Sequence, residues 1–161
     1  MNQAAWLVDI GYVVKTAAKA HFKIDYLKVE AVLAGRFGSV RTFLFNGYAS
    51  DIPIPDGLHK FYTTMRDHGM SVCLHEMRDR TQRRVDVDLA AHMIWQASVP
   101  GVEHIILTTG DQDFIPAVKM AQETFEKRVT LFTYGLNVSM KLQNQVDSHL
   151  RFEDVERDVS R

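Results

Sequence analysis

The sequence predicts an α/β domain in which a parallel sheet lies between two layers of helices, a three-layer Rossmann-like fold. Short apolar segments that fit strands alternate along the chain with longer amphipathic segments that fit helices. The strand-like segments are almost continuously apolar, which is typical of strands covered on both faces. Strand–helix–strand connections of this kind are right-handed and carry helices to the faces of the sheet.

Each predicted strand is rich in aliphatic, branched or aromatic residues, and the strands are expected at 4–10, 40–48, 71–77, 103–109 and 128–133. Helices are expected at 26–36, 56–68, 86–98, 113–125 and 139–145. Gly69 fits a C-terminal cap for the second helix, and Pro100 follows the third. Pro116 falls in the first turn of the fourth helix, where proline is tolerated.

Length and composition favour one self-sufficient domain. The chain has 161 residues, of which 46% are hydrophobic and 24% charged, with a formal net charge of −1. A chain of this size buries about 70% of its unfolded surface without a metal or disulfide. The single cysteine, Cys73, excludes a disulfide framework and a cysteine-rich zinc site. We expect one domain over residues 1–152 and a charged C-terminal tail, 153–161, that frays.

The N-terminal residues 1–14 are apolar but contain Asp9 and no basic leader, so no signal peptide is expected. No apolar run approaches the ~20 residues of a membrane helix. A cytoplasmic protein is expected, and a homodimer is compatible with the modest size and apolar helices. The near-zero net charge does not exclude nucleic acid as a partner, since local patches matter more than the sum.

Acidic residues follow or precede the predicted elements at one end of the sheet. Asp9 closes the first strand, Asp111 and Asp113 follow the fourth, and Asp86 and Asp88 open the helix after the third. Ligands of open parallel sheets bind beyond the carboxyl ends of the strands, where these side chains are expected to meet. Helix capping is the alternative reading, and it applies to Asp86 and Asp113 more readily than to Asp9.

Clustered carboxylates predict a divalent cation, because like charges held close together raise one another's pKa unless a cation lies between them. Mg²⁺ or Mn²⁺ is the natural choice, since both take carboxylate oxygens and keep waters for a phosphate substrate. Such an ion activates water and stabilises the charge that develops on a phosphodiester.

Three motifs then carry a family resemblance: VDIGY at 8–12, RRVDVDLAAHM at 83–93 and TTGDQDF at 108–114. In order and spacing they resemble the signatures of NYN domains, a PIN-like branch of nucleases that includes the LabA-like proteins. The resemblance runs from about Trp6 to Phe152 and implies metal-dependent cleavage of RNA. The acidic positions that it implies, both catalytic and metal-binding, are Asp9, Asp86, Asp111 and Asp113.

The chain departs from the family pattern at two places. Members usually carry an asparagine about three residues after the first aspartate, where this chain has Tyr12 and Val13. Many carry an aspartate where this chain has His92. Asp88 lies four residues before His92 and on the same helix face, so it is a candidate replacement. His92 is either a neutral ligand or proton shuttle, or a partly buried helix histidine.

Basic residues precede Asp86 in the stretch MRDRTQRRVDVD, which contains Arg78, Arg80, Arg83 and Arg84. They are read either as phosphate contacts for RNA or as a solvated surface. Lys15, Lys19 and Lys23 extend this track after the first strand. Thr109 is a candidate hydrogen-bond partner for a substrate phosphate or a metal-bound water. Tyr12 is a candidate for base stacking, with core packing as the alternative.

Two functions remain open: a Mg²⁺- or Mn²⁺-dependent ribonuclease, and a catalytically decayed module of the same fold that binds RNA or a protein. Other classes lack their motifs, because the chain has no G-x-G-x-x-G after the first strand, no G-x-x-x-x-G-K, and Gly11 where a dehalogenase-like phosphatase has a second aspartate. The acids alone do not distinguish RNA from DNA.

Overall fold

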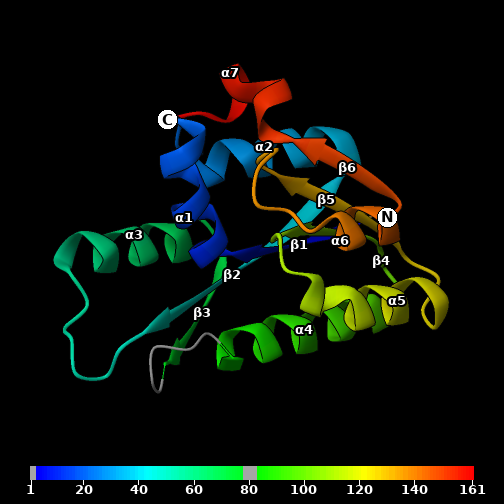
Figure 1. The fold of residues 1–161 in the computed structure, drawn as a ribbon, viewed down its shortest axis with the longest axis horizontal. Helices are drawn as coiled ribbons and strands as arrows, with labels where there is room; N and C mark the ends of the chain where they lie inside the picture. The colour runs from blue at the N-terminus through cyan, green and yellow to red at the C-terminus, as the bar shows by residue number, and fades with distance from the viewer. Residues whose placement is uncertain (1–2, 78–82) are drawn as a thin grey trace.

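The computed structural model describes residues 3–77 and 83–161, except for the Arg83 side chain. It contains a six-stranded sheet in the order β3-β2-β1-β4-β5-β6 (Figure 1). Each neighbouring pair of strands is parallel. The α/β fold with a parallel sheet is therefore confirmed.

The strands are β1 (Gln3–Asp9), β2 (Ser39–Tyr48), β3 (Ser71–Glu76), β4 (Val102–Thr108), β5 (Arg128–Thr133) and β6 (Ser148–Arg151). The longer helices are α1 (Ile10–Ala20), α2 (Tyr26–Phe37), α3 (Asp56–Asp67), α4 (Arg83–Ser98) and α5 (Ile115–Glu123). The short helical segments are η2 (Gln112–Phe114), α6 (Met140–Gln145), η3 (Phe152–Val155) and α7 (Glu156–Val159).

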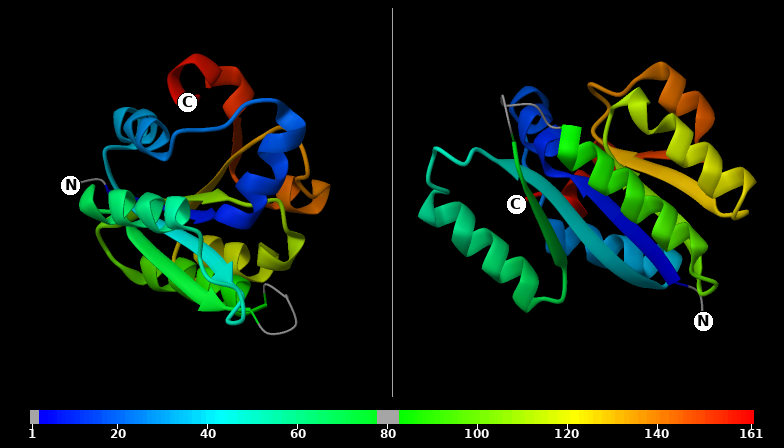
Figure 2. Two further views of the ribbon diagram at one scale, coloured as in Figure 1. Left: turned by 90° about the vertical axis from the view of Figure 1, so that its left-hand side faces the viewer. Right: turned by 90° about the horizontal axis from the view of Figure 1, so that it is seen from below.

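The sheet has a hydrophobic core on each face. Trp6 and Val8 of β1 belong to the core under α1, α2, α3 and α7, while Ala5 and Leu7 belong to the core under α4, α5 and α6. This alternation explains why the strand is apolar at every position. Figure 2 shows the two helical layers on either side of the sheet. Within residues 3–77 and 83–161, no helix has the length and apolar character of a membrane span.

Helix α1 and strand β6 were among the elements that were not predicted. Helix α1 follows β1 without a loop, because the Asp9 side chain accepts a hydrogen bond from the Tyr12 N–H and caps the helix. Its sequence, IGYVVKTAAKA, contains a glycine and β-branched residues that hide the helical pattern. Strand β6 is short and half-polar, so its sequence lacks the apolar run of the other strands.

Two helix starts also differ from expectation. α4 begins at Arg83, three residues before the expected start. The helix expected at 113–125 is preceded by the 3₁₀ turn η2, and α5 begins only at Ile115. Pro116 stands at the start of α5, where its missing N–H costs no intrahelical hydrogen bond.

The expectation that residues 153–161 fray is wrong. Phe152 and Val159 are fully buried, and Ser160 forms a β-bridge with Ile24. The Arg161 N–H donates to the Lys23 carbonyl over 3.0 Å. The charged residues of this segment alternate with apolar ones at 152, 155 and 159, a helical spacing that composition alone does not reveal.

Val159→Ala tests whether the C-terminal segment is part of the core. It should lower the free energy of unfolding by about 2 kcal/mol, because two buried methyl groups are lost and a small cavity remains. Urea denaturation measures the change. Val87→Ala is the control, since Val87 is 68% exposed. Equal effects of the two substitutions would mean that the C-terminal segment is not packed in solution.

Candidate active site

The first group of acids lies where the central strands end. β1 and β4 are neighbours, and the strand order changes direction between them, which makes this the switch point of the sheet. Asp9 ends β1, and Asp111 lies just beyond the end of β4. Both line a cavity of about 420 Å³, here named the acid cavity, together with Gly11, Tyr12, Lys15, Thr16, Thr109, Gly110 and Asn137.

Hydrogen bonds hold these acids in place. The Thr109 hydroxyl donates to Asp9 Oδ2 over 3.1 Å and also accepts a long hydrogen bond from the Asp111 N–H at 3.4 Å. The Asp111 side chain accepts from the Asp113 N–H over 2.8 Å and so caps η2. Thr109 is fully buried, so it positions the two acids from within the protein.

Asp9 is 7% exposed. Burial raises the pKa of its carboxyl, and the negative charge of Asp111 raises it further. Hydrogen bonds from the Tyr12 N–H, the Thr109 hydroxyl and the Gly11 N–H oppose this rise because they favour the charged form.

The second group of acids borders a neighbouring cavity. Asp86, in the first turn of α4, and Asp113 line this space of about 290 Å³ with Val87, Ala90 and Phe114. Burial and, to a smaller extent, the charges of Asp9, Asp111 and Asp113 together raise the pKa of Asp86 to about 6. The four predicted acids therefore act on one another electrostatically, although they come from three separate stretches of the chain.

The acids do not form a closed metal cage. Among the described residues, no three histidine, cysteine, aspartate or glutamate side chains meet the geometry of a metal site. Their chemistry nevertheless fits Mg²⁺ or Mn²⁺, because carboxylate oxygens are suitable ligands and Mg²⁺ commonly keeps several waters while bound by one or two carboxylates. Burial chiefly, and the neighbouring carboxylates in part, raise the pKa values of Asp9 and Asp86, and a bound cation would oppose this rise by favouring their charged forms.

One wall of the acid cavity was not predicted. The loop after β5 is held by the Tyr12 hydroxyl, which donates to the carbonyls of Leu136 (2.8 Å) and Tyr134 (3.2 Å). A Cβ at Gly110 would overlap the carbonyl oxygen of Asn137, so only glycine allows this approach. Asn137 is thus brought into the acid cavity by long-range contacts. No local sequence pattern predicts that Asn137 belongs to the site. Tyr12 itself is buried and anchors the loop.

Asp88 and His92 lie away from the acid cavity. Asp88 Oδ2 is 2.5 Å from His75 Nε2, and Asp88 Oδ1 is 3.0 Å from His92 Nδ1. The His92 ring packs against Phe43, Phe45 and Trp95, the setting of a partly buried structural histidine. The structure thus gives neither residue the role of an additional ligand in the acid cavity.

Of the predicted basic residues that the structure describes, Lys15 lines the acid cavity. Arg84 is exposed and borders a different space with His75, Val87, Asp88 and Ala91. Arg78 and Arg80 lie outside the described residues, as does the Arg83 side chain.

Fold and site together define a doubly wound α/β domain with a carboxylate-rich pocket at its switch point. The NYN domain family matches residues 3–153, and the chain belongs to this family, a branch of the PIN-like nuclease superfamily. The resemblance noted in the sequence is therefore confirmed.

A crystal structure of a protein of unknown function from Vibrio parahaemolyticus is similar, with a TM-score of 0.80 and 25% identity over 99% of this chain and 96% of that one. A Medicago truncatula protein in complex with UDP-glucose has a TM-score of 0.42 and 13% identity over 82% of this chain and 29% of its own, which carries no functional argument. No curated protein matches the chain significantly.

Asp86→Asn should make the protein more stable at neutral pH. The pKa of Asp86 rises from 3.8 to about 6 on folding, so ionisation costs stability as the pH rises through this interval. Above pH 6 the variant should unfold about 2–4 °C higher, which corresponds to about 1 kcal/mol for a half-exposed, screened group. Below pH 4 the difference should vanish.

Thermal unfolding of the wild type and of Asp86→Asn between pH 3.5 and 8 measures the difference in melting temperature. Asp51→Asn is the matched control, because Asp51 is an exposed loop residue. A constant difference at all pH values would show that folding does not raise the pKa of Asp86.

Proposed function

We propose that this NYN domain is a metal-dependent ribonuclease that hydrolyses RNA phosphodiester bonds. The observation that supports the proposal is that Asp9 and Asp111 line the acid cavity, Asp86 and Asp113 line the neighbouring cavity, and the charges of the other three acids contribute to the raised pKa of Asp86. Family membership supports a nuclease.

Each residue has a role that follows from its place. Asp9 and Asp111 share the acid cavity and would hold Mg²⁺ or Mn²⁺, which supplies an activated water and stabilises charge on the phosphate. Asp113 would orient the attacking water or, together with Asp86, would hold a second ion. Thr109 keeps Asp9 and Asp111 at a fixed separation.

Lys15 and Asn137 provide the complementary polar groups. Lys15 is a cation on the wall of the cavity that Asp9 and Asp111 also line, where it would bind a substrate phosphate. The Asn137 amide makes one long hydrogen bond, 3.4 Å to the Thr16 hydroxyl, and is placed to exchange it for one to the substrate. In-line attack by water would leave 5′-phosphate and 3′-hydroxyl ends.

The proposal includes a cytoplasmic location, because the lone thiol Cys73 suits a reducing compartment and RNA is present there. A homodimer remains a prediction.

The alternative is a catalytically decayed domain that binds RNA or a protein. The absence of three close metal-ligating side chains among the described residues favours it, as does the placement of Asp88 and His92 outside the acid cavity. The two functions differ in their dependence on a divalent ion, which the next experiment measures.

Asp111→Asn should reduce cleavage of single-stranded RNA at least about a hundredfold, because a metal-holding charge is lost. Asparagine caps a helix as well as aspartate does, so the turn at η2 should persist. The melting temperature should be unchanged or higher, since repulsion with Asp9 and Asp86 is relieved. A gel assay with Mn²⁺, on RNA and on DNA of the same sequence, measures the effect.

Asp51→Asn should cleave like the wild type. Mn²⁺ should raise the melting temperature of the wild type more than that of Asp111→Asn, because binding to the folded state alone stabilises it. Undiminished cleavage by Asp111→Asn would overturn the assignment. RNA binding without any Mn²⁺-dependent shift would favour the non-catalytic module.

Asn137→Gly should lower kcat/KM for RNA about tenfold, the cost of losing one hydrogen bond to a charged group. The backbone of Asn137 is left-handed, with φ at 56°, so glycine preserves the loop. Glu126→Gly is a matched control at the same φ of 56°. Steady-state kinetics and melting curves of both variants separate a lost substrate contact from a loosened fold. Equal kinetics would remove Asn137 from the site.

A further inference from the structure

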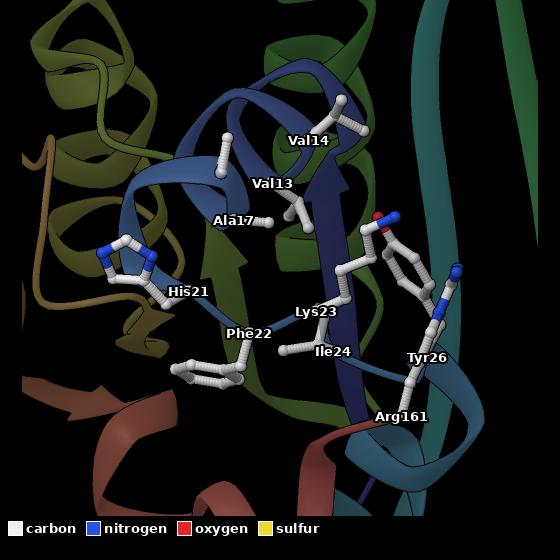
Figure 3. A pocket seen from close by; sticks show the side chains of 10 residues that line it. Val13, Val14, Ala17, His21, Phe22, Lys23, Ile24, Tyr26 and Arg161 are labelled. Carbon is white, nitrogen blue, oxygen red and sulfur yellow. The ribbon is translucent and has the colours of Figure 1, made fainter.

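A second large cavity lies along the other side of α1. It has a volume of about 630 Å³ and is largely apolar. Figure 3 shows Val13, Ala17 and Ile24 around its centre, with Phe22 on one side and Tyr26 on the other. The remaining lining residues are Val14, Ala18, His21, Lys23 and Arg161. We name this space the α1 cavity.

The charged and titratable groups of the α1 cavity favour an anion. Lys23, Arg161 and His21 line it, and none of its described lining residues has an acidic side chain. In Figure 3 Lys23 and Arg161 lie beside the Tyr26 ring. Apolar walls that include two aromatic side chains, with cations on the rim, suit a flat base attached to a phosphate.

The walls of the α1 cavity are fixed before any ligand arrives. The Tyr134 hydroxyl donates to the Phe22 carbonyl over 2.9 Å, and the Arg161 N–H donates to the Lys23 carbonyl over 3.0 Å. The bridge between Ile24 and Ser160 holds the same loop. A preformed cavity binds without the cost of ordering its own walls.

Helix α1 connects this cavity to the acid cavity. Tyr12, Lys15 and Thr16 line the acid cavity, and Val13, Val14 and Ala17 of the same helix line the α1 cavity. With 11 residues, α1 is about 16 Å long. Lys15 and the exposed Lys19 lie one turn apart on one face, and Lys23 follows beyond the helix end. Cations therefore mark a path from one cavity to the other.

We propose that the α1 cavity is a nucleotide subsite, which holds one base of the same RNA strand that is cut at the acid cavity, while Lys15, Lys19 and Lys23 contact the phosphates between. This inference rests on the proposed nuclease function and extends it to a part of the strand away from the scissile bond. It makes cleavage depend on strand length, because a short RNA does not reach the α1 cavity.

Two variants test the subsite. Ala18→Phe fills the cavity from an exposed helix position, and Lys23→Ala removes a cation from its rim. Matched controls are Ala34→Phe, at an exposed position of α2, and Lys60→Ala, at an exposed position of α3. The probe is a fluorescent single-stranded RNA of about 12 nucleotides, within the range of usual site sizes. Anisotropy in EDTA measures its affinity without cleavage, and melting curves verify each fold.

Ala18→Phe should weaken binding about tenfold, the loss of one stacked base. Lys23→Ala should lower the salt dependence of binding by about one counterion. An abasic nucleotide, scanned along the probe, should weaken wild-type binding at one position and add no further loss to Ala18→Phe, since both remove the same contact. With Mn²⁺, Ala18→Phe should slow cleavage of the long RNA but not of a dinucleotide.

The outcomes separate this inference from the function on which it rests. If the wild type binds and cleaves RNA and both variants do so equally well, the subsite is wrong and the nuclease proposal stands. If the wild type binds no RNA, both are wrong. If Ala18→Phe and the abasic position act independently, the cavity serves another occupant, such as a protein segment, and the base-binding proposal is overturned.

Discussion

The site depends on the burial of one carboxylate at the end of the central strand. Asp9 is held by the Tyr12 N–H and the Thr109 hydroxyl, and these same contacts start α1 and tie β1 to the segment that carries Asp111. A buried carboxylate without such donors would be costly. These donors come from both sides of the switch point. The contacts that stabilise the buried Asp9 carboxylate therefore also set the distance between Asp9 and Asp111.

Repulsion among the four aspartates lowers the stability of the fold. A function that requires these acids would explain why they lie near one another. Asp86 and Asp9 both have raised pKa values, chiefly because they are buried and in part because other carboxylates are near. Strongly shifted groups in a cavity are characteristic of functional sites, although structural networks also produce them. Here the raised pKa values belong to Asp9 and Asp86, which the family resemblance also identifies as site residues. The electrostatic argument does not depend on the sequence motifs.

Much of the fold could be predicted from local patterns. The first strand and the helix expected at 56–68 follow from the spacing of their apolar residues and from the glycine that follows each of them. Their predicted bounds differ from the observed ones by about one residue. Helix α1 could not be predicted, because its glycine and β-branched residues hide the helical pattern and it follows β1 directly after its cap, Asp9. The packing of the C-terminal segment was not predicted, because its many charged residues hide the helical spacing of the apolar residues at 152, 155 and 159. Asn137 could not be found, since tertiary contacts alone bring it to the acids.

The contact between Gly110 and the Asn137 carbonyl has a consequence for how this domain can vary. A side chain at 110 would collide with the main chain of a loop that the Tyr12 hydroxyl also fastens. A substitution at Gly110 therefore requires the loop after β5 to move, and that movement would disturb the carbonyls that the Tyr12 hydroxyl holds. The turn after β4, the loop after β5 and the first turn of α1 are in this way sterically coupled.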